Sequence, residues 1–224
     1  MLLKLEHVSK TYLAEIPVSV LKNIDLEINA GSTTAIVGPS GSGKSTLLNA
    51  IGSLTEIDTG KILFKDRDLS AFNPDEKALY RNKDIGFVFQ QHFLLPQMSL
   101  LENVLMPTLA FPEKEKAEAL RDHARKLLDR VDLLKRQDHR PGQCSGGECQ
   151  RAAVVRALIN GPELILADEP TGSLDQIAAE NLTDLMLELN REIGVALIFV
   201  THSEKLVDRI EDKYTLVNGN LSQL

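Results

Sequence analysis

Alternating apolar and polar residues open the chain, and this pattern predicts half-exposed β-strands. The alternation runs through residues 3–8 and again through residues 24–28. Residues 61–64 follow Thr59-Gly60 and indicate a further strand. We therefore expect a small antiparallel sheet in the first part of the chain.

Continuous apolar runs follow, and they are typical of strands buried on both faces of a parallel sheet. They lie at residues 33–37, 85–89, 164–167 and 195–200. Between the second and the third run the pattern becomes helical, from Ser99 to about Asn160. Buried strands with helical crossovers predict an α/β fold.

The segments between the predicted strands contain sequence patterns that predict helices and turns. Asn73-Pro74 is a typical helix start, and Ser99 with Glu102 resembles a capping box. The charged residues 113–130 predict a surface helix, and apolar spacing over residues 178–189 predicts a long amphipathic one. Tyr12 falls in a turn-prone segment, and Asn218-Gly219 predicts a turn near the end of the chain.

A phosphate-binding pattern links the first buried strand to a helix. The pattern G-x-x-x-x-G-K-[ST] is matched, and one residue extended, by Gly38-Pro39-Ser40-Gly41-Ser42-Gly43-Lys44-Ser45-Thr46. Its backbone N–H groups suit phosphate oxygens, Lys44 adds a positive charge, and Ser45 offers a hydroxyl to Mg²⁺. A Gly/Ser-rich turn could imitate the pattern, but the flanking strand and helix favour a nucleotide site.

Composition narrows the class of protein. The chain has 224 residues, of which 43% are hydrophobic, and this is enough for a substantial core. Its net charge of −7, without a long Lys/Arg cluster, argues against nucleic acid as the main partner. Neither a signal peptide nor an apolar run long enough to span a bilayer is visible, so we expect a soluble cytoplasmic chain. The two cysteines do not make a disulfide framework.

Polar residues at the strand ends are candidates for chemistry, because ligands of open α/β sheets collect there. Asp168 is a candidate Mg²⁺ ligand and the adjacent Glu169 a candidate general base, although two acids at a strand end could simply be solvated. His202 could orient the γ-phosphate and the attacking water, and Gln90 could reach Mg²⁺ or that water. A lone histidine or glutamine at such a place is often structural.

Taken together, these motifs resemble those of an ATP-binding-cassette (ABC) ATPase, in the same order and over nearly the whole chain. The matching segments are residues 38–46 (Walker A), Gln90 (Q-loop), Ser145-Gly146-Gly147-Glu148 (signature), Asp168-Glu169 (Walker B), Ser173-Leu174-Asp175 (D-loop) and His202 (H-loop).

The resemblance implies a single nucleotide-binding domain over residues 1–224, with a RecA-like P-loop core, an antiparallel β subdomain and a helical subdomain. We expect the α/β core at about residues 1–90 and 161–224, and the helical subdomain at about 91–160. It also implies that adenine stacks on Tyr12, that Ser45, Gln90 and Asp168 hold Mg²⁺, and that ATP joins two copies head to tail, with the signature of one copy covering the other's P-loop.

Four segments are similar to a bacterial subgroup of ABC ATPases that includes lipoprotein-releasing, macrolide-exporting, peptide-detoxifying and cell-division members. These segments are residues 92–96, 101–104, 145–148 and 168–175. The similarity and the free-standing length favour ATP-driven lipoprotein release through separate transmembrane permease subunits. This implies a peripheral position on the cytoplasmic face of the inner membrane. The alternatives are peptide or macrolide export, or a nucleotide-gated regulator. A soluble ABC ATPase for DNA or ribosomes is disfavoured, because coiled-coil and basic stretches are missing.

Two cysteines lie where the ABC signature usually has other residues. The family usually has Leu and Gln where this chain has Cys144 and Cys149, which we interpret as small packing residues rather than a metal or redox pair.

Three apolar residues directly follow the Q-loop, namely Phe93, Leu94 and Leu95. Three consecutive apolar residues cannot all face one surface, so we expect at least one, for example Leu94, to be exposed for a membrane partner.

Overall fold

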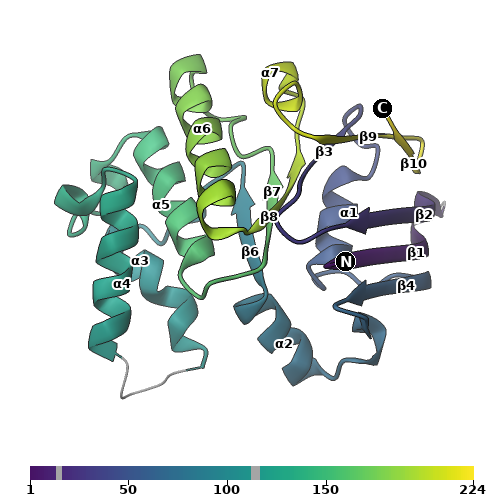
Figure 1. Ribbon diagram of the computed structural model, residues 1–224, viewed down its shortest axis with the longest axis horizontal. Coiled ribbons are helices and arrows are strands. Elements are labelled where there is room, and N and C mark those ends of the chain that lie inside the picture. The colour runs from purple at the N-terminus through teal and green to yellow at the C-terminus, as the bar shows by residue number, and fades with distance from the viewer. Residues whose placement is uncertain (14–16, 112–116) are drawn as a thin grey trace.

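The computed structural model describes residues 1–13, 17–111 and 117–224, which form two β-sheets with helices packed around them (Figure 1). The smaller sheet is antiparallel and has the strand order β2-β1-β4-β5. Its strands are β1 (Leu3–Tyr12), β2 (Val18–Ile28), β4 (Thr59–Phe64) and β5 (Arg67–Asp68). The antiparallel sheet expected from the alternating pattern is therefore confirmed.

Tyr12 corrects the prediction in one detail. It is the last residue of β1, paired with Val18 of β2, and does not lie in a turn. The cross-strand pairing keeps the backbone extended beyond the point where the local sequence suggested a turn. Its side chain is exposed, and Lys10 Nζ lies 5.6 Å from the centre of its ring.

The larger sheet has six strands in the order β10-β9-β3-β8-β7-β6. All its neighbours are parallel except β9 and β10, which form a hairpin. The strands are β3 (Thr33–Val37), β6 (Ile85–Phe89), β7 (Leu164–Asp168), β8 (Ala196–Val200), β9 (Asp212–Val217) and β10 (Asn220–Gln223). The four continuous apolar runs thus form adjacent parallel strands, from β3 to the edge strand β6, as a sheet covered on both faces requires.

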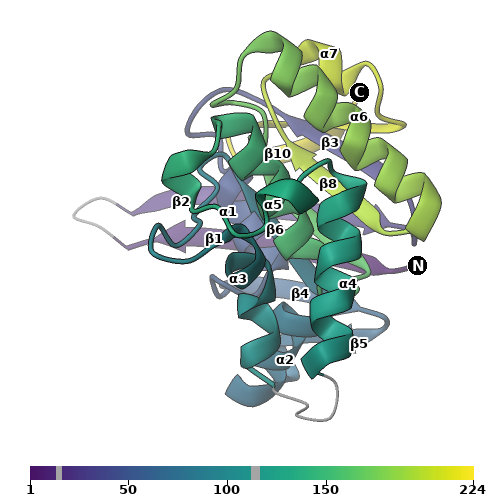
Figure 2. The same ribbon diagram turned by 90° about the vertical axis from the view of Figure 1, so that its left-hand side faces the viewer.

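Alternate residues of these strands enter two separate cores. Ala35, Ala167 and Phe199 belong to one apolar cluster, whereas Ile36 and Val200 belong to the other. The first cluster is closed by helices α3 (Leu100–Leu105), α4 (Ala117–Arg130), α5 (Gly146–Leu158) and α6 (Gln176–Ile193). The second contains α1 (Lys44–Ile51), α2 (Pro74–Lys83) and the small sheet. Figure 1 shows α3, α4 and α5 on the side away from the small sheet, and Figure 2 shows the same helices from that side.

Short helices complete the fold. They are α7 (Glu204–Val207) and the 3₁₀ helices η1 (Leu69–Ala71), η2 (Met106–Leu109), η4 (Leu134–Arg136) and η5 (Pro141–Gln143). Residues 113–116 of the predicted surface helix lie outside the described residues, and its remainder is found in α4. The α/β fold and the P-loop architecture predicted from the sequence are confirmed.

Side-chain caps explain where three helices begin. Asn73, Ser99 and Ser145 are the N-cap residues of α2, α3 and α5, and each forms a reciprocal capping box with a glutamate three residues later. A capping box satisfies two backbone donors that the first turn of a helix leaves free. The predicted box of Ser99 and Glu102 is confirmed, with Ser99 N–H donating to Glu102 Oε2 at 2.7 Å.

Candidate functional site

Strand register brings the predicted site residues to one edge of the large sheet. Phe89, Asp168 and Val200 are paired across β6, β7 and β8, and Ile36 of β3 is paired with Val200. The residues that follow these positions are therefore neighbours at the carboxyl ends of the strands. They are Gln90, Glu169, Thr201 with His202, and Gly38 of the phosphate-binding loop.

The phosphate-binding loop connects β3 to α1 through positions that only glycine fits. Gly38 has φ 150°, and a Cβ on it would lie 2.1 Å from the carbonyl oxygen of Leu216. Gly43 is the N-cap of α1 with φ 104°, and a Cβ there would lie 2.8 Å from the carbonyl oxygen of Val20. The loop is therefore packed tightly against β9 and β2 and can curl around an anion.

Lys44 is buried at the start of α1, and its ammonium group bonds with the loop itself. Nζ donates to the carbonyl oxygens of Gly38 at 2.8 Å and Pro39 at 3.0 Å. Burial lowers the pKa of Lys44, and the charges of Glu169 and Asp168 oppose that shift. The ammonium group of Lys44 therefore lies close enough to both carboxylates to interact with them electrostatically. The Ser42 hydroxyl is also buried in this loop and has no hydrogen-bond partner among the described residues.

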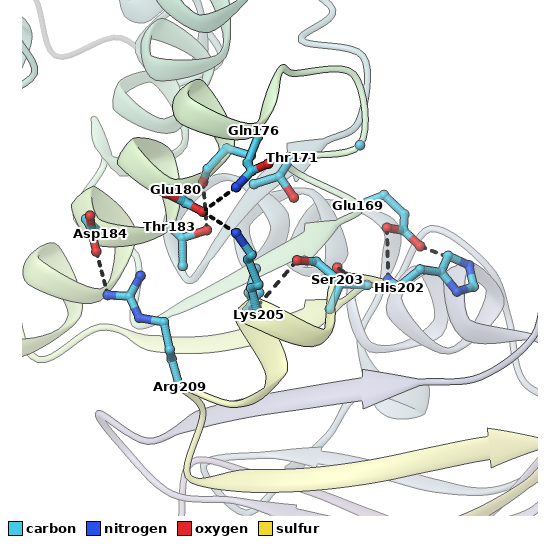
Figure 3. A pocket seen from close by; sticks show the side chains of 14 residues that line it. Glu169, Thr171, Gln176, Glu180, Thr183, Asp184, His202, Ser203, Lys205 and Arg209 are labelled. Atoms are coloured by element: carbon cyan, nitrogen blue, oxygen red, sulfur yellow. Dashed lines mark hydrogen bonds and ion pairs between the residues drawn. The ribbon is translucent and has the colours of Figure 1, made fainter.

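Glu169 and His202 face each other at the ends of β7 and β8 (Figure 3). Glu169 Oε1 lies 3.2 Å from His202 Nε2, and Glu169 Oε2 accepts a hydrogen bond from the backbone N–H of His202 at 3.2 Å. His202 Nε2 is also 3.4 Å from Lys44 Nζ. Glu169 has φ 48°, a left-handed conformation that is uncommon for a residue with a side chain and that often marks functional sites.

A cleft of about 480 Å³ opens beside this pair, between α6 and α7. Two ion pairs connect α6 to α7 and to the turn that follows it, Lys205 of α7 with Glu180 at 2.6 Å and Arg209 of the turn with Asp184 at 2.5 Å. Figure 3 shows Lys205 and Arg209 each reaching a carboxylate of α6. Because α7 begins directly after His202 and Ser203, these contacts hold the segment that carries His202.

Gln90 is exposed at the end of β6 and is held through its backbone. Ser173 Oγ donates to its carbonyl oxygen at 3.0 Å, so the segment predicted as the D-loop touches the Q-loop within the same chain. The buried Gln150 of α5 donates from Nε2 to the carbonyl oxygen of Phe89 at 2.6 Å. Sequence reasoning missed Gln150, because nothing in its local pattern indicates a contact with residues 61 positions away.

The residues Ser145 to Glu148 begin α5 and lie apart from the phosphate-binding loop. Helix α5 packs in the apolar cluster on one face of the large sheet, whereas α1 belongs to the cluster on the other face. Ser145 Oγ accepts the N–H of Glu148 at 3.1 Å, and Ser145 N–H donates to Glu148 Oε2 at 2.7 Å. The hydrogen bond that the Ser145 backbone N–H donates to the carboxylate is the main cause that lowers the pKa of Glu148. Here Glu148 serves as a helix cap, a role that we did not predict.

With this geometry established, comparison with known proteins identifies the family. The sequence pattern of the ABC transporter family matches residues 21–172, which is more than half of the chain. The chain belongs to the ABC transporter family. It is therefore an ABC ATPase, and the family resemblance seen in the order of its motifs is confirmed.

Relatives of known name are similar over the whole chain. The lipoprotein-releasing system ATP-binding protein LolD of Idiomarina loihiensis is 47% identical over 98% of this chain and 96% of its own length. The protein of the same name from Myxococcus xanthus is 44% identical over 99% of both chains. Among solved structures, the ABC cassette MJ0796, dimeric and bound to ADP and Pi in a post-hydrolysis state, is 38% identical. It has a TM-score of 0.89 and covers 99% of this chain and 98% of its own.

Tyr12, on which the ABC resemblance predicts that adenine stacks, is connected to the phosphate-binding loop through β2. Val20 packs against Gly43, and Tyr12 is paired with Val18 on the neighbouring strand. The exposed ring of Tyr12 is thus on the part of the small sheet that reaches this loop. An exposed aromatic face near a phosphate cradle suits the stacking of a flat base.

The two departures from the usual ABC signature, Cys144 and Cys149, pack in the same apolar cluster. Cys149 is buried, and the partly buried Cys144 packs against the same cluster. They occupy the positions just before the N-cap and in the first turn of α5, where apolar pairs commonly staple a helix start. Burial raises the pKa of both thiols, that of Cys149 to about 11. Among the residues that the structure describes, no three His, Cys, Asp or Glu side chains gather into a metal-binding group.

The donors expected for Mg²⁺ suit a hard cation. Ser45 presents an exposed hydroxyl at the first turn of α1, Asp168 ends β7, and Gln90 follows β6 at the same sheet edge. Hydroxyl, carboxylate and amide oxygens are the ligands that Mg²⁺ prefers. The residues present therefore fit this ion.

Proposed function

We propose that this chain is the ATP-hydrolysing subunit of a complex that releases lipoproteins from the inner membrane. The observation that carries the proposal is the full-length similarity to lipoprotein-releasing ATP-binding proteins, at 47% identity over 98% of the chain in one case. The convergence of the strand ends on the phosphate-binding loop supports the ATP-hydrolysing part independently.

The proposed reaction divides roles among the residues at the sheet edge. The loop from Gly38 to Thr46 binds the phosphates through its backbone N–H groups, and Lys44 exchanges its contacts with Gly38 and Pro39 for phosphate oxygens. Glu169 accepts a proton from the attacking water as general base. His202 and Gln90 orient the γ-phosphate and that water.

Ser45, Gln90 and Asp168 would hold Mg²⁺ together with the nucleotide. When bound, Mg²⁺ supplies positive charge that neutralises the phosphate oxygens. The proximity of Asp168 and Glu169 to Lys44 supports a common site for these groups.

The signature residues act in this proposal on a second copy of the chain. Ser145, Gly146 and Gly147 lie at the start of α5, on the other face of the sheet from α1. They reach a γ-phosphate most simply when it is bound to the phosphate-binding loop of another subunit, in a head-to-tail homodimer. The dimeric structure of a 38% identical cassette supports this arrangement.

Separate transmembrane subunits complete the proposed complex. Within the described residues, no helix combines the length and the apolar character needed to cross a membrane. We place the chain at the cytoplasmic face of the inner membrane, held there by its partners. Closing and opening of the ATP-bound dimer would drive those partners.

Reconstitution tests the proposal. The chain, co-purified with its transmembrane subunits and placed in proteoliposomes, should release an acylated lipoprotein only when ATP is added. The same complex carrying Glu169→Gln should bind ATP without releasing the lipoprotein. A complex that hydrolyses ATP at a normal rate but releases no lipoprotein would contradict the proposal and favour export of another substrate or a regulatory role.

A further inference from the structure

Arg136 of η4 forms an ion pair with Glu148 in the first turn of α5. Arg136 Nε lies 3.4 Å from Glu148 Oε1. The other carboxylate oxygen, Oε2, accepts a hydrogen bond from the backbone N–H of Ser145 at 2.7 Å. One carboxylate therefore joins the guanidinium of η4 to the N-cap residue of α5.

Backbone bonds hold the segment that presents Arg136. Two N–H groups at the start of α3, those of Leu100 and Leu101, donate to the carbonyl oxygens of His139 and Gln137, each at 2.9 Å. The Arg136 side chain also donates from Nη1 to Nε2 of His139 at 3.1 Å. The guanidinium is thus positioned by its own turn and by α3, independently of the carboxylate that it contacts.

Glu148 is an ionised residue at the start of a helix. The bond from the Ser145 N–H is the main cause that lowers its pKa; burial opposes this shift, and the charges of Arg136 and Arg151 add to it. A carboxylate in the first turn suits the helix itself, because the positive end of the helix dipole attracts it. The same negative charge, however, repels any further anion that approaches this helix start.

The proposed head-to-tail dimer brings such an anion to α5. In that dimer Ser145 and the N–H groups of Gly146 and Gly147 face the γ-phosphate on the other copy's loop, within one helical turn of Glu148. A carboxylate without a counter-charge would weaken this contact. The Arg136 side chain is 46% exposed, and exposed ion pairs contribute little to folding. The approaching phosphate therefore accounts for the pair better than the stability of the subunit does.

We propose that Arg136 is a positioning residue for ATP-driven dimerisation, which neutralises and orients Glu148 so that the start of α5 can accept the γ-phosphate bound to a second copy. This rests on the proposed function, because it assumes the head-to-tail dimer. Arg136 acts through Glu148 and Ser145 rather than on the nucleotide. With the carboxylate paired, the helix dipole and the N–H groups of the first turn remain available to attract the phosphate.

A charge series at Arg136 tests the proposal in the full-length Glu169→Gln chain, which should keep its bound ATP. Sedimentation velocity gives the ATP concentration at which half of the chain is dimeric. We expect this concentration to stay near that of the parent for Arg136→Lys, to rise severalfold for Arg136→Gln and to rise about tenfold or more for Arg136→Glu.

A second substitution isolates the contact with Glu148. Glu148→Gln keeps a side chain that can accept the Ser145 N–H, as in other capping boxes, but removes the negative charge. In a chain that carries Glu148→Gln, the further change Arg136→Gln should therefore not raise the ATP requirement. An equal rise with and without the Glu148 carboxylate would overturn the proposal.

Controls exclude a general effect on folding or on nucleotide binding. Lys135→Gln removes the same charge from the neighbouring, exposed residue of η4 and should leave the ATP requirement unchanged. Melting temperature and the affinity of the monomer for ADP should be nearly constant across the Arg136 series, because α5 and α1 pack in different apolar clusters.

The outcomes also separate this proposal from the proposed function. Equal ATP requirements for folded Arg136→Lys, Arg136→Gln and Arg136→Glu chains would overturn the role of Arg136, and the first two suffice if the third does not fold. If the Glu169→Gln parent forms no dimer with ATP, the head-to-tail dimer of the proposed function fails instead.

Discussion

The Glu169 carboxylate contacts His202 twice, through the imidazole Nε2 at 3.2 Å and the backbone N–H at 3.2 Å. The two residues come from the ends of neighbouring strands, β7 and β8, whose register places them side by side. Glu169 is thereby held in one orientation next to Lys44. A base fixed in this way loses little freedom when it engages the attacking water.

We expect Glu169→Gln to bind ATP and to hydrolyse it very slowly. The amide preserves the shape of the side chain but cannot take a proton, so the contribution of general-base catalysis, ~10²–10⁴-fold, should disappear. Single-turnover hydrolysis and calorimetry measure the two properties separately. Glu211→Gln, an exposed carboxylate away from the site, is the matched control. A decrease of less than about tenfold in turnover would assign the base to another group.

Lys44→Ala should abolish ATP binding. Nζ is buried in the phosphate-binding loop and bonds with the carbonyl oxygens of Gly38 and Pro39, so the charge is already placed for phosphate oxygens. Charge-assisted hydrogen bonds of this kind contribute about 1.5–3 kcal/mol each. Isothermal titration with ATP is the measurement, and Lys22→Ala, on the exposed face of β2, is the control. Near-normal affinity in Lys44→Ala would contradict the role of the loop.

The patterns that predicted the phosphate-binding loop and the buried strands are local ones. The phosphate-binding motif lies within nine consecutive residues, and the buried strands appear as continuous apolar runs that end in Asp168 or before Thr201 and His202. Because parallel strands end at one edge of a sheet, finding the strands was enough to bring these residues together. The predicted capping box of Ser99 with Glu102 is equally local, since both partners lie within one helical turn.

What the sequence did not reveal depends on contacts between distant segments. Leu94 is only 6% exposed, so our example of an exposed residue was wrong, and Phe93 takes that place. The reason lies in Phe93, whose φ of 47° turns the chain and directs Leu94 into the core. That conformation is costly for a bulky residue and is supported by Arg156, 63 positions away. The spacing of hydrophobic residues along the chain cannot predict a hydrogen bond between residues so far apart in the sequence.

The oligomeric state should depend on ATP. The wild-type chain alone should be mainly monomeric, because the proposed dimer contacts run through the γ-phosphate between one loop at Lys44 and the other copy's Ser145. Glu169→Gln with ATP should be dimeric, because it cannot remove that phosphate. Sedimentation velocity with and without ATP measures both states, and Ser145→Arg in the Glu169→Gln background should prevent the dimer. A dimer that forms equally without nucleotide would contradict this mechanism.

The thiols beside the signature should react slowly while the protein is folded. With the pKa of Cys149 raised to about 11, roughly one molecule in a thousand carries its thiolate at pH 8, and the thiolate is the reactive form. Iodoacetamide labelling followed by mass spectrometry should therefore modify Cys149 far more slowly in the folded chain than in urea. Cys144→Ala with Cys149→Ala should retain ATP turnover. Fast labelling in the folded chain, or loss of turnover in a folded double variant, would contradict a packing role.

Phe93 is the position at which we expect docking of the membrane partner to be most sensitive to a loss of apolar contact. Its ring is 59% exposed next to Phe89, and its carbonyl oxygen is held by Arg156, so the backbone should keep its shape when the ring is removed. Phe93→Ser should leave the melting temperature of the isolated subunit nearly unchanged but weaken assembly with the transmembrane subunits. ATP hydrolysis should then continue without transport, because Gln90 lies three residues away and loses its link to the partner. Thermal melting, pull-down and ATPase rates alone and in complex measure these effects.

Ile193→Ser, which removes a side chain of similar exposure at the end of α6, controls for a general effect of lost apolar surface. Normal assembly and normal coupling in folded Phe93→Ser would move the docking site elsewhere.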